Sequence, residues 1–162
     1  MKELLEKISS YNIFNYLLPG VLFALITNNF TKYTIPIDNI IIGAFVCYFI
    51  GLVVSRFGSL IIEPTLKKIG FLKFADYSDF VSASKKDSKI ELFSEVNNMY
   101  RTLSSLLVLT FLLKFYEFLE VKINGLSEWS PYILLTLLLL MFLLSYRKQT
   151  GYITKRINVN NK

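Results

Sequence analysis

Four long apolar segments stand out in the pattern of hydrophobic and polar positions along this chain. Each approaches the roughly 17–25 residues that an α-helix needs to cross a hydrocarbon core about 30 Å thick. The segments are Asn12–Asn29, Asn39–Ser55, Leu103–Leu119 and Tyr132–Tyr146. The pattern predicts an all-α membrane protein with four transmembrane helices.

The first segment has a competing interpretation as a cleavable signal peptide, because Lys2 and Lys7 precede it. A small-residue cleavage site of the A-x-A kind is missing, and LITNNFTKY follows instead. Glu3 and Glu6 also dilute the positive charge ahead of the apolar run. We therefore expect this segment to be retained as a membrane span.

The distribution of basic residues predicts the orientation of the spans. Lys and Arg are concentrated in both termini and between the second and third spans, whereas each short loop has one, Lys32 and Lys122. Segments rich in Lys and Arg stay in the cytoplasm. We expect a multi-pass protein of the bacterial inner membrane with both termini in the cytoplasm.

Four regions follow from this topology. They are a first transmembrane hairpin (1–55), a cytoplasmic helical insertion (56–102), a second transmembrane hairpin (103–146) and a basic cytoplasmic tail (147–162).

Local signals within the insertion predict where its helices begin and end. Pro64 is expected to end the second helix, because proline lacks a backbone donor, and Asp76 to cap a short helix. Ser88 and Glu91 have the S-x-x-E spacing of a capping box. No Gly or Pro follows before Gly125. A single helix of about thirty residues is therefore expected to rise into the third span.

The second span carries a small residue at every fourth position: Gly43, Cys47, Gly51 and Ser55. Small residues let membrane helices approach each other closely. The face that they share is expected to be covered by the first or fourth helix of the same chain or by the same helix of a second subunit.

Pro19 and Gly20 lie in the middle of the first span. They predict a kink, a hinge, or a span that begins only after them, because proline interrupts the helical hydrogen bonding.

Lys114 and Glu117 are charged residues inside the third predicted span, three positions apart. Charged side chains within a membrane are costly, and by default they suggest a functional site that faces a bundle interior or water. The same pair is also expected where a span ends at the lipid headgroups, since a lysine side chain can reach toward the interface. Both interpretations stay open at this point.

The cytoplasmic part of the long helix presents Ile90, Phe93, Val96 or Asn97, and Tyr100 at helical spacing. This face is expected either to pack on the short helix before it or to dock a cytosolic protein partner.

Residues that carry catalysis are scarce. The chain has no histidine and a single cysteine, Cys47, which excludes histidine-based catalysis, histidine metal sites and internal disulfides. No glycine-rich phosphate-binding loop occurs. We expect no enzymatic activity, no cofactor and no metal.

The formal net charge of +6 has an explanation in the topology. The basic residues flank apolar spans, where they attract anionic lipid headgroups. No RNA-binding aromatic run or helix-turn-helix pattern supports direct binding of nucleic acid.

Two classes of function remain. The first is a membrane sensor or anchor that holds a cytosolic partner. The second is a small oligomeric pore or membrane-perturbing effector, whose lumen would be formed by Lys114, Glu117 and the polar side of the first span. A pore needs a polar stripe through the full depth of a helix, whereas Leu103–Leu113 contains only apolar residues, Ser and Thr. The sequence favours the anchor.

The overall plan of the chain combines four predicted spans, both termini in the cytoplasm, and the segments YNIFNYLLPG and SKIELFSEVNNMYRTL. This plan resembles small bacterial inner-membrane proteins of phage-defence operons, in particular the membrane subunit of the Kiwa system. The resemblance implies a homo-oligomeric envelope sensor that holds a cytosolic, DNA-binding effector subunit on its basic and aromatic insertion.

Overall fold

The computed structural model describes residues 12–37 and 39–161, and every regular element within these ranges is a helix. In chain order the elements are η1 (Ile13–Leu17), α2 (Leu18–Phe30), α3 (Ile40–Phe57), η2 (Gly58–Ile62), α4 (Glu63–Lys68), α5 (Tyr77–Lys86), α6 (Lys89–Lys122) and α7 (Leu126–Asn160). Four helical runs are long and apolar enough to cross a membrane: Ile13–Phe30, Ile40–Lys68, Lys89–Lys122 and Leu126–Asn160. The predictions of an all-α chain and of four candidate spans are confirmed.

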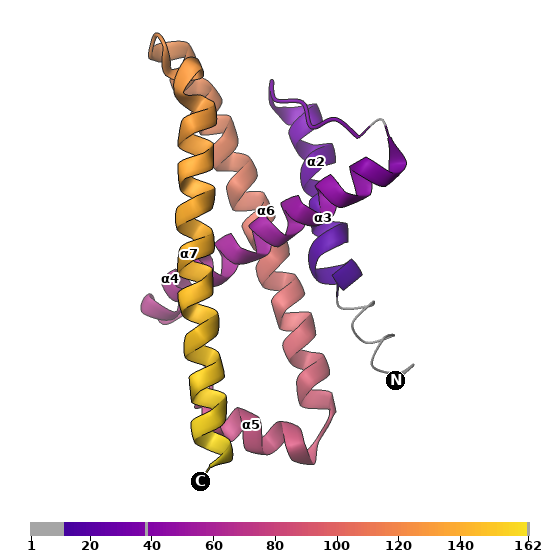
Figure 1. Cartoon of the computed structure of the whole chain (residues 1–162), viewed down its shortest axis with the longest axis vertical. Coiled ribbons are helices and arrows are strands. Elements are labelled where there is room, and N and C mark those ends of the chain that lie inside the picture. The colour runs from indigo at the N-terminus through magenta and orange to yellow at the C-terminus, as the bar shows by residue number, and fades with distance from the viewer. Residues whose placement is uncertain (1–11, 38, 162) are drawn as a thin grey trace.

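The helices α6 and α7 form a long antiparallel hairpin, and the run from α3 through η2 to α4 crosses this hairpin obliquely (Figure 1). Helix α2 lies against α3, and α5 lies beside the end of the hairpin where the C-terminus is found (Figure 1). The four candidate spans therefore do not form a bundle of parallel rods, and α3 contacts every other candidate span.

The second helix does not end at Pro64. The π-helical turn η2 comes directly before it, and the amide of Glu63 donates to the carbonyl of Gly58, five residues back. This wider turn displaces the carbonyl with which a proline ring collides in a regular α-helix. The helical run therefore continues through α4 to Lys68, and the prediction that Pro64 ends it is wrong.

The same arrangement occurs at Pro19 in the first candidate span. The π-helical turn η1 precedes α2, and the amide of Leu18 donates to the carbonyl of Ile13. Pro19 follows in the first turn of α2, and the wider turn before it moves away the carbonyl group that its ring would otherwise meet. The helix passes through Pro19 without a break.

The small-residue face of α3 lies against η1 and α2 of the same chain. A Cβ atom added to Gly51 would overlap the carbonyl oxygen of Tyr16 and lie 2.6 Å from its carbonyl carbon. A Cβ atom added to Gly20 would collide with the carbonyl group of Cys47 in the same way. Two glycines, one from each helix, thus let the two backbones touch, as in close helix pairs in membranes.

The remaining small residues of this row meet other helices. Ser55 and Ser59 are also buried, although a four-residue step rotates the row by about 40° each time around an α-helix. At the end of the row, Ser59 accepts hydrogen bonds from Lys148 of α7. Its neighbour Gly58 lies against Ser105 of α6. The small residues of this helical run therefore contact the first, third and fourth candidate spans.

The helix α6 has 34 residues without interruption, as the sequence predicts, but it begins differently. The backbone of Ser88 is already helical and its side chain makes no capping hydrogen bond, so the predicted capping box with Glu91 is wrong. The amide of Lys89 donates instead to the Asp87 carboxylate at 2.9 Å. Asp87 has an extended backbone, which is the conformation that a capping side chain requires.

The short helix α5 begins directly after Asp76, whose backbone is extended. Its position is the one predicted for a cap, although the Asp76 side chain makes no capping hydrogen bond.

Three helices run across the boundaries between the predicted regions. Helix α3 crosses residue 55, α6 crosses residue 102 and α7 crosses residue 146 without a break. The predicted tail therefore belongs to α7 and packs against α5. There, Tyr152 lies 6.2 Å from the ring of Tyr77, and Lys85 donates to Asn160 at 3.1 Å.

Candidate functional site

A buried ionic cluster joins α4 and α6. The Glu63 carboxylate accepts hydrogen bonds from Arg101 at 2.8 Å and from Lys67 at 3.0 Å. The side chains of Glu63 and Arg101 are only 11% and 19% exposed. Because the pair is largely shielded from water, each charge depends on the other: either partner alone would be a buried, uncompensated charge.

Lys148 brings α7 into this region. Its ammonium group donates to the carbonyl oxygen of Ser59 at 2.5 Å and to the Ser59 hydroxyl at 2.8 Å. Ser59 precedes Glu63 by one helical turn. We call Ser59, Glu63, Lys67, Arg101 and Lys148 the Glu63 cluster, which ties three candidate spans together at one level.

A second cluster lies at the opposite end of α6. The side chain of Glu120 is 3% exposed and pairs with Lys32 at 2.7 Å. It also accepts hydrogen bonds from the Tyr33 hydroxyl at 2.6 Å and from the Ser130 hydroxyl. The hydroxyl oxygens of Tyr116 and Ser130 lie 2.9 Å apart and share a hydrogen bond. We call Lys32, Tyr33, Tyr116, Glu120 and Ser130 the Glu120 cluster.

Tyr33 lies in the connection between α2 and α3, outside the candidate spans. Burial and the hydrogen bond to the Glu120 carboxylate together hold the pKa of Tyr33 above its ordinary value. The hydroxyl therefore keeps its proton and donates at neutral pH, because both causes disfavour the phenolate.

Lys114 and Glu117, predicted as a pair within the third span, lie 3.0 Å apart. Glu117 also accepts a hydrogen bond from the backbone amide of Lys32 at 3.4 Å. Since Lys32 pairs with Glu120, the charged pair adjoins the Glu120 cluster. The pair therefore lies near the end of α6, beside the connection between α2 and α3.

The two clusters bracket a slab without charged side chains. Arg101 and Glu120 are about 28 Å apart along α6, and Ser130 and Lys148 about 27 Å apart along α7, at 1.5 Å per residue. Residues 102–113 of α6 and 131–146 of α7 contain no charged residue. At the same rise these uncharged stretches are about 18 Å long on α6 and about 24 Å long on α7, and Lys114 and Glu117 lie between the α6 stretch and Glu120. The uncharged slab therefore fits within a hydrocarbon core about 30 Å thick.

The N-terminal part of α6 lies beyond the Glu63 cluster and presents an aromatic face. Phe93 and Tyr100 are 66% and 62% exposed, and Asn97 is exposed between them. Ile90, predicted with them, is half-buried. Val96, the predicted alternative to Asn97, is exposed, and so is Leu92, which the helical spacing alone did not include in this face.

The helix α5 supports this part of α6. Val81 is buried, and α5 packs between α6 and the C-terminal part of α7. Among the described residues, α5 contributes the Lys85–Asn160 hydrogen bond and the Tyr77–Tyr152 ring contact to α7. The predicted insertion and tail thus form one helical platform, which local patterns could not reveal because the two segments are far apart in the chain.

No family model, no curated protein and no solved structure matches this chain. The function is therefore argued from the geometry of the two clusters, the uncharged slab and the aromatic face.

Proposed function

We propose that the chain is a multi-pass anchor of the bacterial inner membrane that holds a cytosolic protein partner on the aromatic face of α6. The observation that carries this proposal is the exposure of Phe93 and Tyr100 on a helix that continues without interruption into a candidate span. The face lies outside the uncharged slab, so lipid chains do not cover it.

Exposed aromatic side chains at helical spacing are suited to protein recognition. Large aromatic side chains are enriched among the residues that contribute most to binding free energy. Here they stand on a helix whose position is set by α5 and by the Glu63 cluster, so little ordering is required when a partner binds.

The charge around this face indicates the kind of partner. Lys85, Lys86 and Lys89 are exposed where α5 leads into α6. Asp87 and Glu91 are exposed among them, so a partner surface with an apolar centre and a rim that carries both charges would complement this face. The resemblance to membrane proteins of phage-defence operons supports a role as an oligomeric sensor whose partner is a cytosolic effector.

A reporter experiment tests the orientation. We expect alkaline phosphatase to be active when it is fused after Asn124, in the connection between α6 and α7, and inactive when it is fused after Lys86. The reason is the concentration of Lys and Arg on the Lys86 side. A fluorescent protein that folds only in the cytoplasm should give the opposite pattern. Phosphatase activity after Lys86 would contradict the proposal.

Substitution of the aromatic face tests the partner. We expect a photo-crosslinking residue at position 93 to capture a cytosolic protein. The double substitution Phe93→Glu with Tyr100→Glu should release that same protein from isolated membranes, with an affinity loss of roughly a hundredfold if each aromatic contributes about 1.4 kcal/mol or more.

The matched control is Ser78→Glu with Ser82→Glu, which adds the same charge on the exposed side of α5. This control should retain the captured protein on the membrane. The proposal fails if no cytosolic protein is captured, or if the double glutamate variant of α6 retains it as well as the control does.

A further inference from the structure

An open groove of about 700 Å³ lies between α7 and the run formed by the end of α3 and η2. Twelve residues line it, and they fall into an apolar group and a polar group. The apolar group is Phe57, Leu60, Ile61, Leu137, Leu140, Met141 and Leu144. The polar group is Arg147, Lys148, Tyr152 and Lys155, and Gly151 lies within this second stretch.

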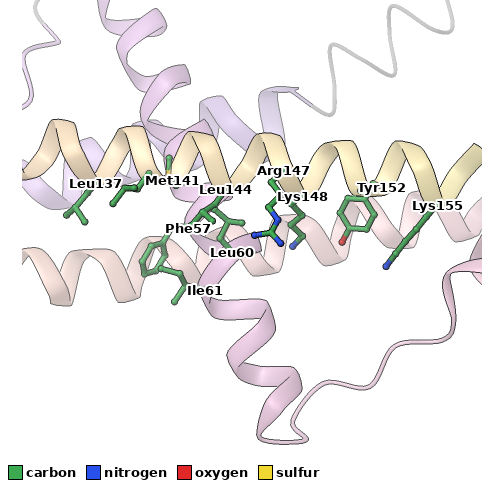
Figure 2. Close-up of a pocket in the computed structure, with 12 residues that line it drawn as sticks. Phe57, Leu60, Ile61, Leu137, Met141, Leu144, Arg147, Lys148, Tyr152 and Lys155 are labelled. Carbon is green, nitrogen blue, oxygen red and sulfur yellow. The ribbon is translucent and has the colours of Figure 1, made fainter.

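The two groups are separated along the groove. Figure 2 shows Leu137, Met141 and Leu144 following one another along α7, and then Arg147 and Lys155 further along the same helix. The change from apolar to cationic occurs at the level of Lys148, which belongs to the Glu63 cluster. It therefore coincides with one boundary of the uncharged slab.

The cations at the polar end are available to a ligand. Within the described part of the chain, neither Arg147 nor Lys155 pairs with a carboxylate, and both are exposed. Lys148 is held in place by Ser59. Three positively charged side chains thus line one end of an otherwise apolar groove.

We propose that this groove binds an anionic phospholipid. The acyl chains lie along the apolar group at the depth of the hydrocarbon core, and Arg147 and Lys155 contact the phosphate. Arginine and lysine form charge-assisted hydrogen bonds with phosphate oxygens, and tyrosine, here Tyr152, adds a hydroxyl donor.

This inference goes beyond the partner proposal and rests only on the placement of the chain in a membrane. The site is tested on the purified protein in detergent, without a cytosolic partner. Failure of lipid binding there would leave the partner experiment unaffected.

Native mass spectrometry with added lipid provides the first test. We expect phosphatidylglycerol to bind about tenfold more tightly than phosphatidylcholine with the same acyl chains. The double substitution Arg147→Gln with Lys155→Gln should remove this tenfold preference, which corresponds to about 1.4 kcal/mol of binding free energy. The control Lys86→Gln with Arg156→Gln removes the same charge from residues that do not line the groove and should keep the preference.

Filling the groove provides the second test. A Cβ atom added to Gly151 meets no atom within 4 Å, so Gly151→Trp can place an indole in the groove without disturbing the backbone. We expect Gly151→Trp to reduce binding of phosphatidylglycerol about tenfold, and Gly151→Ala to bind as the native chain does.

Inorganic phosphate separates a lipid from a free anion. Millimolar phosphate should not displace phosphatidylglycerol, because it lacks the acyl chains that the apolar group contacts. The proposal is overturned if phosphate displaces the lipid, if both lipids bind equally to the native chain, or if the Arg147 and Lys155 substitutions behave like their control.

Discussion

Replacing Gly51 with alanine is expected to destabilise the protein more than any other single methyl addition to α3. The added Cβ would overlap the carbonyl oxygen of Tyr16 and lie 2.6 Å from its carbonyl carbon. Overpacking usually costs about 1–3 kcal/mol when side chains can give way. Here the atoms in the way belong to the backbone, so we expect the free energy of unfolding to fall by about 3 kcal/mol or more. The loss would be measured as a lower melting temperature in detergent and as reduced accumulation in membranes.

Other glycines provide matched controls for this substitution. Gly20→Ala should have a similar effect, because its Cβ would collide with the carbonyl of Cys47. Gly43→Ala should be close to neutral, since its nearest atoms are 3.4 Å away in Ile37. Gly151→Ala should gain up to about 1 kcal/mol from helix propensity. Equal melting temperatures for Gly51→Ala and Gly151→Ala would show that η1 does not touch α3.

Replacing Glu63 with glutamine is expected to cause the second large loss of stability. Glu63 is the acceptor for both Arg101 and Lys67, and glutamine would leave the poorly exposed Arg101 without a counter-ion. Breaking a buried ion pair from one side costs about 3–5 kcal/mol. Because Lys67 is partly in solvent, we expect the free energy of unfolding to fall by about 3 kcal/mol, the lower end of that range. Thermal unfolding in detergent would measure this loss.

Two further variants distinguish the loss of this pair from a general effect of removing a carboxylate. Glu91→Gln removes an exposed carboxylate of α6 and should change stability by less than about 0.5 kcal/mol. The pair Glu63→Gln with Arg101→Met removes both charges and should recover part of the loss. If Glu63→Gln unfolds at the same temperature as Glu91→Gln, the Glu63 cluster does not stabilise the fold.

The sequence by itself determined the class of fold and the number of candidate spans. Long apolar segments must satisfy their backbone hydrogen bonds internally in a membrane, so they form helices regardless of their neighbours. It also determined where the charged residues stand relative to the apolar runs. The small-residue row could likewise be recognised as a packing face, because the spacing of Gly43, Cys47 and Gly51 is a local property of one helix.

Only the tertiary structure decided how these helices meet. Pro64 was predicted to end a helix, but η2 lets the helix continue to Lys68 and places Glu63 beside Arg101. The groove arises in the same way, because the continued run brings Leu60 and Ile61 opposite α7. Such features depend on contacts between residues distant in sequence. The period of a single helix carries no information about which neighbour will cover each face or which charges will pair.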